Sequence, residues 1–315
     1  MDQTFEAGAR LSAIDTRMTG RFRMTSAYLV HAREPALVET GPTTSAEAVT
    51  AGLAALGMGP EDLAHIVVTH IHLDHAGGVG RIAAGFPGAT VWVHERGARH
   101  LADPARLVAS AAEVYGGSER LLELFGPMDP VDGGRIRSVA DGDHIPLGDR
   151  QLDVMYTPGH AFHHVSLVDS DSGALFTGDA LGIHFPDVRV LRPATPPPDI
   201  DVELAVDSIE RIRARAETAL MFSHFGPVRE VDELCTVAGD RIRKWAGIVR
   251  AAMDQTDDLD RITEILSART SAEFDDAGAG EEARERHEVL SGMRMNAAGL
   301  VRYWTKKAER EAAGG

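Results

Sequence analysis

Residues 69–78, which read T-H-I-H-L-D-H-A-G-G, restrict what this chain can fold into more than any other segment. Its candidate metal ligands are His70, His72, Asp74 and His75. The segment follows residues 65–69, an apolar and β-branched run that is typical of a buried strand. A loop at the end of a strand lets the first two histidines point the same way, while the aspartate and the last histidine project to a neighbouring point. Imidazole and carboxylate groups bind zinc, iron or manganese, so the pattern predicts a metal site.

The alternative for this segment is a polar turn with solvated histidines. A metal site is favoured because such groups, packed together without a metal, would repel one another on protonation. Cysteine cannot supply the ligands, since Cys235 is the only one in 315 residues. One cysteine excludes both an intrachain disulfide and a cysteine-rich zinc module, and we interpret Cys235 as an inert, small hydrophobic residue.

The pattern along the chain predicts an α/β body up to about residue 230 and a helical remainder. Strands that alternate with helices, followed by further strands, favour layered sheets with helices outside. The expected strands are 24–30, 36–39, 65–69, 90–93, several short ones within 135–176, and 219–222. The expected helices are 45–57, a short one beginning at 60–62, 77–84, those within 95–125, 201–216, and most of the chain after 230. Residues 193–198 are proline-rich and predict an extended loop.

The formal charge of 32 − 48 = −16 is acidic. This charge disfavours a nucleic-acid partner, which usually needs a broad basic surface, and adsorption to an anionic membrane. Residues 1–20 lack the apolar stretch of a signal peptide, and no run of apolar residues is long enough to span a bilayer. The sequence therefore predicts a cytoplasmic, soluble protein without a nucleic-acid or membrane partner.

Three later motifs resemble residues 69–78, because each places a candidate metal ligand at the expected end of a strand. They are Thr157-Pro158-Gly159-His160, Phe176-Thr177-Gly178-Asp179-Ala180 and Phe222-Ser223-His224-Phe225-Gly226. Together and in this order, the four motifs resemble the signature of the metallo-β-lactamase-fold hydrolases, over roughly residues 28–226. The resemblance implies a four-layer αββα sandwich, here as a catalytic domain at 1–230. A helical C-terminal region at 231–315 would follow it.

The resemblance also implies a site with two divalent metal ions, for which zinc is the first candidate and iron or manganese are alternatives. One ion would be bound by His70, His72 and His160, the other by Asp74, His75 and His224, with Asp179 bridging both. Such a pair shares a bridging hydroxide, since a metal lowers the pKa of bound water. Asp74 would also take up the proton released on attack and pass it to the leaving group.

Four other residues have weaker roles in this interpretation. His164 lies four positions after His160, where family members often carry a second histidine, and we expect it to support the site. His163 replaces the glycine that usually precedes it. His163 and His184 either line the substrate pocket or are solvated loop residues. Glu39 stands where the family usually has an aspartate, and we expect it to orient the metal-binding loop.

The reaction predicted is hydrolysis of a small ester, thioester or lactone. A lactonase is disfavoured because Gly182 stands where these enzymes carry tyrosine, and a β-lactamase because His75 stands where the commonest subclass has another residue. The glyoxalase II-like thioesterases share the first three motifs, but residues 181–185 lack their glycine-rich, arginine-bearing stretch. The alternatives are an iron oxidoreductase similar to the persulfide dioxygenases, a metal-bound module without turnover, and, less favoured, a nucleic-acid phosphodiesterase.

The helical C-terminal region has one regular apolar pattern, formed by Leu290, Met293, Ala297, Leu300 and Trp304. Their helical spacing predicts a single apolar face. We expect this face to pack in the core or to form a homodimer, with a lid over the pocket as the alternative. Substrate specificity is expected to lie in residues 95–131, 183–200 and the chain beyond 230.

Overall fold

A computed structural model describes residues 2–185 and 187–314. These residues form two compact units that alternate along the chain. The first unit consists of the described residues of Met1–Tyr156, His163–Gly178 and Glu217–Arg229. The second consists of those of Thr157–Phe162, Asp179–Ala216 and Glu230–Gly315. The chain passes from one unit to the other several times. The passage after Arg229 lies close to the predicted boundary near residue 230, and the other passages lie within the predicted catalytic domain. The division into domains at 1–230 and 231–315 stays a prediction.

The first unit contains a sheet with, among the described residues, seven strands in the order β1 to β7. Strands β1 to β4 pair in antiparallel fashion, and β4 to β7 pair in parallel fashion. The strands are β1 (Thr4–Gly8), β2 (Leu11–Asp15), β3 (Ser26–Val30), β4 (Ala36–Val38), β5 (His65–Val67), β6 (Thr90–His94) and β7 (Ile136–Val139). The strands expected at 24–30, 36–39, 65–69 and 90–93 are confirmed, whereas β1 and β2 were not predicted.

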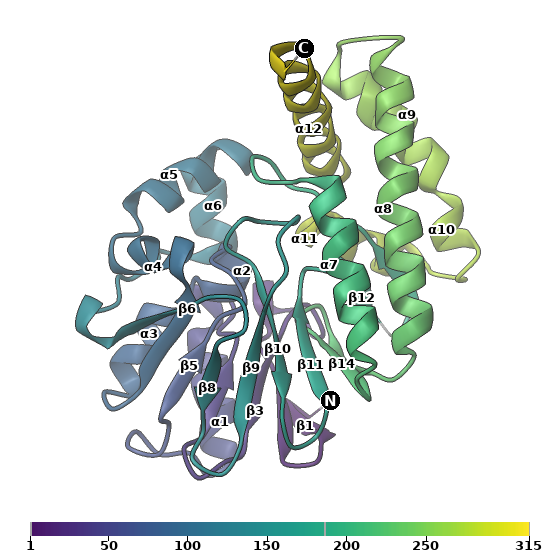
Figure 1. Cartoon of the computed structure of the whole chain (residues 1–315). Coiled ribbons are helices and arrows are strands. Elements are labelled where there is room, and N and C mark those ends of the chain that lie inside the picture. The colour runs from purple at the N-terminus through teal and green to yellow at the C-terminus, as the bar shows by residue number, and fades with distance from the viewer. Residues whose placement is uncertain (1, 186, 315) are drawn as a thin grey trace. The chain divides into compact units, whose positions relative to one another are not determined.

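A second sheet of the same unit has the strand order β15-β14-β11-β10-β9-β8 (Figure 1). Its strands are β8 (His144–Pro146), β9 (Gln151–Tyr156), β10 (Val165–Asp169), β11 (Ala174–Gly178), β14 (Ala219–Phe222) and β15 (Gly226–Val228). Apolar side chains of both sheets form one core. Within it, the Tyr28 ring meets the Phe176 ring edge-on at 5.4 Å, and the Tyr28 hydroxyl donates to the Phe222 carbonyl at 2.6 Å. The two sheets therefore pack face to face as a sandwich.

Short helices complete the first unit. They are α1 (Ala46–Ala55), α2 (Leu73–Ala76), α3 (Val79–Gly85), α4 (Glu95–Ala102), α5 (Ala105–Val114) and α6 (Ser118–Phe125), with 3-10 turns at Met18–Gly20, Thr43–Ser45 and Gly133–Arg135. The short helix predicted to begin at 60–62 is wrong. The Gly59 amide donates to the Asp62 carboxylate at 2.7 Å, and the Asp62 amide donates back to the Gly59 carbonyl at 3.1 Å. These two bonds close a turn, and β5 begins three residues later.

The second unit is mainly helical. It contains the antiparallel pair β12 (Ile183–Phe185) and β13 (Val190–Arg192), which was not predicted, and helix α7 (Val202–Arg215). After residue 230 come α8 (Val231–Met253), α9 (Leu259–Thr270), α10 (Ala272–Asp275), α11 (Glu281–Leu290) and α12 (Met293–Gly314). The Asp201 side chain accepts a hydrogen bond from the Leu204 amide at 3.2 Å and so caps α7. The predicted helix at 201–216, the loop at 193–198 and the helical remainder are confirmed.

The apolar face predicted across 290–304 is divided between two helices. Leu290 ends α11, and the chain leaves the helical conformation at Ser291 before α12 begins at Met293. Ala297 and Leu300 are fully buried, and α12 packs against α8 and α9 of the same unit. The expectation of one continuous helical face is therefore wrong, because a helix end falls inside the pattern. The homodimer stays a prediction.

The α/β fold class with a two-sheet sandwich and C-terminal helices is confirmed. Residues 1, 186 and 315, which the predicted domain and loop ranges include, lie outside the described residues. None of the helices in the described part of the chain combines the length and the apolar character of a membrane span.

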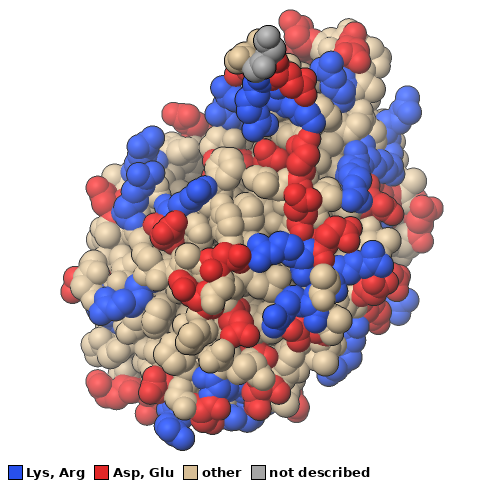
Figure 2. All heavy atoms as spheres, viewed as in Figure 1, with Lys and Arg blue, Asp and Glu red and all other residues tan. Residues whose placement is uncertain are grey.

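Charged side chains of both signs mix on the face shown in Figure 2. Several pairs lie one helical turn apart, such as Arg120 with Glu123 at 2.8 Å and Arg261 with Glu264 at 2.6 Å. Pairs of this kind stabilise exposed helices by a few tenths of a kcal/mol each, about 0.2–0.5 kcal/mol. The face in this view therefore carries a mixture of acidic and basic side chains.

Candidate metal centre

The predicted histidine cluster lies in the loop between β5 and α2 of the first unit. His70 is fully buried in this loop, and His72 is the residue at the N-terminus of α2. Nε2 of His70 lies 3.1 Å from Nδ1 of His72. Asp74 and His75 follow on α2, and their side chains are 10% and 1% exposed. A short helix directly after the loop therefore keeps the second pair of groups close to the first, with the His70 and His75 ring centroids 4.0 Å apart.

Two glycines allow this loop to pass close to its neighbours. A Cβ atom on Gly77 would lie 2.3 Å from the Leu73 carbonyl oxygen, and one on Gly78 would lie 3.1 Å from the Pro42 carbonyl oxygen. The Gly78 amide donates to the Gly41 carbonyl at 2.8 Å. Glycine at both positions is thus required by close backbone contact.

Three candidate ligands of the first unit converge on one point. His224 follows β14 and is fully buried, and its Nε2 lies 3.2 Å from Nε2 of His75. Oδ2 of Asp74 lies 3.5 Å from each of these two nitrogen atoms. The three ligand atoms therefore form a triangle with edges of 3.2–3.5 Å.

These edges fit a tetrahedral zinc site. Zinc binds nitrogen and carboxylate oxygen at about 2.0–2.2 Å, so two ligand atoms of a tetrahedron lie about 3.3–3.6 Å apart. The triangle of Asp74, His75 and His224 has this size, and the distance between His70 and His72 is slightly shorter. The residues present thus fit a divalent metal ion in their chemistry and in their spacing.

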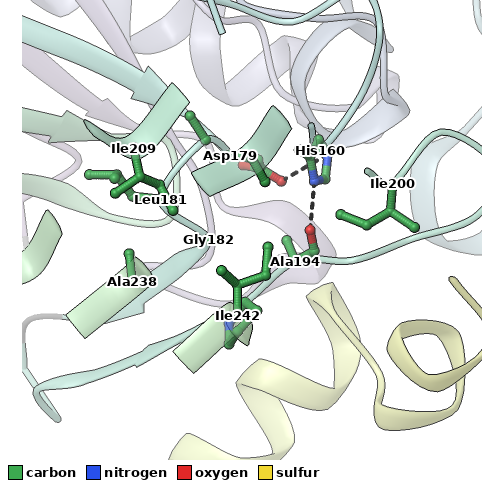
Figure 3. Close-up of a pocket in the computed structure, with 12 residues that line it drawn as sticks. His160, Asp179, Leu181, Gly182, Ala194, Ile200, Ile209, Ala238 and Ile242 are labelled. Carbon is green, nitrogen blue, oxygen red and sulfur yellow. Dashed lines mark hydrogen bonds and ion pairs between the residues drawn. The ribbon is translucent and has the colours of Figure 1, made fainter. Parts of the chain in front are cut away.

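The second unit brings together the other two predicted ligands. Oδ2 of Asp179 lies 3.5 Å from Nε2 of His160, and the side chains are 5% and 4% exposed. Figure 3 shows the two side chains facing each other at one end of a pocket. This distance also equals the edge of a tetrahedral metal site.

In four of the histidines, Nδ1 faces an oxygen atom. The partners are Oγ1 of Thr69 for His70 at 3.0 Å, Oε2 of Glu39 for His75 at 3.3 Å, the Ala194 carbonyl for His160 at 2.9 Å and the Met24 carbonyl for His224 at 3.2 Å. An oxygen acceptor favours the proton on Nδ1 and leaves the lone pair of Nε2 for a metal. All four Nε2 atoms are the ones that face another candidate ligand.

Glu39 lies behind two of these histidines. Its side chain is 2% exposed, and its backbone has a φ of +68°, in the left-handed region. Oε1 accepts hydrogen bonds from the hydroxyl and, at 3.3 Å, the amide of Thr69, while Oε2 lies 3.3 Å from Nδ1 of His75. One buried carboxylate thus contacts His75 directly and His70 through Thr69.

The three histidines with weaker predicted roles lie in different places. Nδ1 of His163 accepts a hydrogen bond from the Ile71 amide at 3.4 Å, and its ring is 5.5 Å from the His72 ring. His164 is fully buried, and its ring lies 4.9 Å from the His70 ring. His184 lies in β12, where burial lowers its pKa to about 4. His163 and His164 therefore join the cluster of the first unit, whereas His184 is not among the described residues that line the pocket at His160.

The groups that orient the histidines were only partly visible in the sequence. Thr69 stands inside the first motif, so its position directly before His70 was a usable signal. The carbonyl groups of Met24 and Ala194 have no such signal, because every residue carries one. The structure places the predicted ligands in two sets, one in each unit, and their assembly into one centre stays a prediction.

Comparisons with known proteins concern the family and the fold of this chain. Residues 20–224 match the model of the metallo-beta-lactamase superfamily. A hydroxyacylglutathione hydrolase of Rhodopseudomonas palustris (strain BisA53) is 31% identical over 156 residues, which is 49% of this chain and 47% of the relative. The acyl-coenzyme A thioesterase MBLAC2 of Homo sapiens is 35% identical over 126 residues, 36% of this chain and 40% of the relative. The chain spans about half the length of the curated relatives that it matches.

Two solved structures have a similar fold. A metallo-beta-lactamase family protein from Thermus thermophilus has a TM-score of 0.64 at 21% identity, with 90% of this chain and 89% of that chain covered. An archaeal metallo-beta-lactamase superfamily protein from Sulfolobus tokodaii has a TM-score of 0.62 at 22% identity, with 88% and 93% covered. At these identities the similarity concerns the fold alone.

Proposed function

The chain belongs to the metallo-beta-lactamase superfamily, and from this premise we propose that it is a metal-dependent hydrolase of a small ester, thioester or lactone. The relatives named hydroxyacylglutathione hydrolase and acyl-coenzyme A thioesterase support hydrolysis of an acyl compound. The observation that carries the proposal is the buried triangle of Asp74, His75 and His224, whose edges match a metal site.

The proposed centre holds two divalent ions. His70, His72 and His160 would bind one ion, Asp74, His75 and His224 the other, and Asp179 both. Support comes from the 3.1–3.5 Å spacing within each unit and from the Nδ1 contacts that leave Nε2 available. Zinc is the proposed metal because it prefers nitrogen and carboxylate ligands, and iron or manganese would accept the same set.

When bound, such ions supply an activated water and polarise the substrate carbonyl. In this proposal, the Asp74 carboxylate takes the proton that the nucleophile releases and delivers it to the leaving group. Its position supports this role, because Oδ2 lies 3.5 Å from Nε2 of both His75 and His224 and the side chain is not fully buried. Glu39 would act as a positioning residue that holds His75, and His70 through Thr69. A cytoplasmic location stays a prediction.

The first test is the metal content of the purified protein and its activity. We expect two zinc ions per chain and turnover within a panel of thioesters, lactones and aryl esters. The double variant His70→Ala/His72→Ala should lose turnover by several orders of magnitude while its circular dichroism spectrum is retained. His144→Ala, a change at an exposed histidine in β8, is the matched control and should behave as wild type.

Three outcomes would overturn the proposal. Full turnover by the double variant would show that these histidines are not needed. One iron ion per chain with oxygen uptake and no hydrolysis would instead indicate an oxidoreductase. A metal-loaded protein that hydrolyses no compound in the panel would contradict hydrolysis itself.

A further inference from the structure

A narrow pocket lies within the second unit, beside the two proposed metal ligands of that unit. Of its lining residues, only His160 and Asp179 are ionisable, and the rest are apolar, proline or glycine. The aliphatic lining comes from Leu181, which precedes β12, from Ile200, Ala205 and Ile209 of the α7 region, and from Ala238 and Ile242 of α8. Figure 3 shows Asp179 and His160 on one side and Ile209, Ala238 and Ile242 on the other. The pocket therefore has one polar end and one apolar end.

The chemistry of the two ends indicates an occupant with two parts. A cavity lined by leucine and isoleucine side chains stays dry, so its apolar end suits a hydrocarbon group better than water. The polar end carries the candidate ligands at which, in the proposed function, the substrate carbonyl reacts. A hydrocarbon group attached to that carbonyl is the acyl chain of the substrate.

The size of the pocket restricts the length of this chain. The cavity leaves a volume of about 10 Å³ for the centre of a water-sized sphere, which is the room that about one water needs. Ile209 is 2% exposed and Ile242 is 6% exposed, and both pack at the apolar end. A methyl group fits this space, whereas a longer chain would have to displace one of these two side chains.

We propose that this pocket binds the acyl group of the substrate and that Ile209 and Ile242 restrict it to a short chain. The inference rests on the proposed hydrolase function and names its substrate class, acyl compounds with an acetyl-sized acyl group. One extra methylene in an apolar pocket changes discrimination by about 10–200-fold. The preference of the enzyme for acetyl over longer acyl groups should therefore be steep.

The test compares 4-nitrophenyl acetate, butanoate and hexanoate as substrates of the zinc-loaded protein. For wild type, kcat/KM should fall with each increase in chain length. In Ile209→Ala, the ratio of hexanoate to acetate should rise about tenfold or more. Ile212→Ala is the matched control, because Ile212 is a fully buried isoleucine on the same helix that does not line the pocket. Ile242→Val, a smaller change on α8, should move the ratio in the same direction if Ile209→Ala does not fold.

Binding of the free carboxylates gives a second measurement that needs no turnover. Hexanoate should raise the melting temperature of Ile209→Ala, or of Ile242→Val, more than that of wild type. Acetate should change the melting temperatures of variant and wild type by the same amount. An unchanged chain-length ratio and an unchanged hexanoate shift in these variants would overturn the inference, as would an equal effect of Ile212→Ala. If no ester is turned over but the hexanoate shift appears, the proposed function fails while the pocket assignment holds.

Discussion

Glu39 offers the sharpest test of how the protein prepares its metal ligands. Glu39→Gln keeps the size of the side chain but replaces the oxygen that faces Nδ1 of His75 at 3.3 Å with an amide nitrogen or a neutral oxygen. If the amide nitrogen faces Nδ1, its protons oppose the proton that Nδ1 carries, and His75 is driven to the tautomer protonated at Nε2. That tautomer has no lone pair to offer a metal, so the site formed with Asp74 and His224 should weaken.

The expected magnitude follows from the contacts that are lost. Loss of a group that orients a metal ligand weakens metal affinity about 10–100-fold. This range corresponds to about 1.4–2.8 kcal/mol, since 1.4 kcal/mol is a factor of about 10. Thr69 can still donate its hydroxyl proton to the amide oxygen, so the orientation of His70 should be largely kept. One of two zinc ions should therefore bind about 10–100-fold more weakly.

Zinc titration against a competing chelator measures both affinities, and thermal unfolding of the metal-free protein checks that the variant folds. Glu34→Gln is the matched control, because Oε2 of Glu34 also lies 3.3 Å from a histidine, at Nε2 of His65, away from the metal ligands. Two unchanged affinities in Glu39→Gln would refute the reasoning. So would a loss of the same size in Glu34→Gln, which would show that the effect is not specific to the site.

Three further predictions concern the packing and titration of other residues. Gly178→Ala should destabilise the protein by about 3 kcal/mol in urea unfolding, because its Cβ would lie 2.4 Å from Nε2 of His164 at a φ of +50°. Gly142→Ala, with a φ of +83° and open space, should cost only about 1 kcal/mol; equal costs would contradict the packing argument. The pKa of about 4 for buried His184 means that the folded state binds fewer protons, so stability falls as the pH drops from about 6.5 towards 4. His184→Gln should remove about 2 kcal/mol of the stability lost between pH 7 and pH 5, and an unchanged pH dependence would count against it. Burial raises the pKa of the Cys235 thiol to about 12, so a thiol reagent at pH 8 should label the protein only after unfolding, whereas rapid labelling of the native protein would disagree.

The sequence was most informative where the chemistry depends on neighbours in the chain. Residues 65–78 form a buried strand, a loop and a short helix, and the strand and the grouping of ligands in this segment were predicted from spacing alone. By contrast, the turn at 59–62 was taken for a helix, because proline and acidic residues suit both structures. The turn is stabilised by the Asp62 carboxylate, which accepts a hydrogen bond from the Gly59 amide.

The local sequence pattern also failed to predict strands that depend on pairing with another strand. Strands β1 and β2 pair with each other, and β12 pairs with β13, but all four are only three to five residues long. Short strands of this kind are stabilised by pairing and burial, which one segment of sequence does not contain. The break between α11 and α12 was hidden for the related reason that apolar spacing continues across it.

The amino-acid sequence alone established the family resemblance and the set of candidate ligands, because metal chemistry needs particular side chains at short and regular spacing. It did not establish which atoms meet. His224 lies 149 positions from His75, and their Nε2 atoms come within 3.2 Å because the two sheets pack face to face, which brings the end of β14 close to the segment that follows β5. The orientation of each histidine likewise depends on acceptors such as the Met24 and Ala194 carbonyls. Such contacts join distant segments through backbone groups common to all residues, so only the folded chain reveals them.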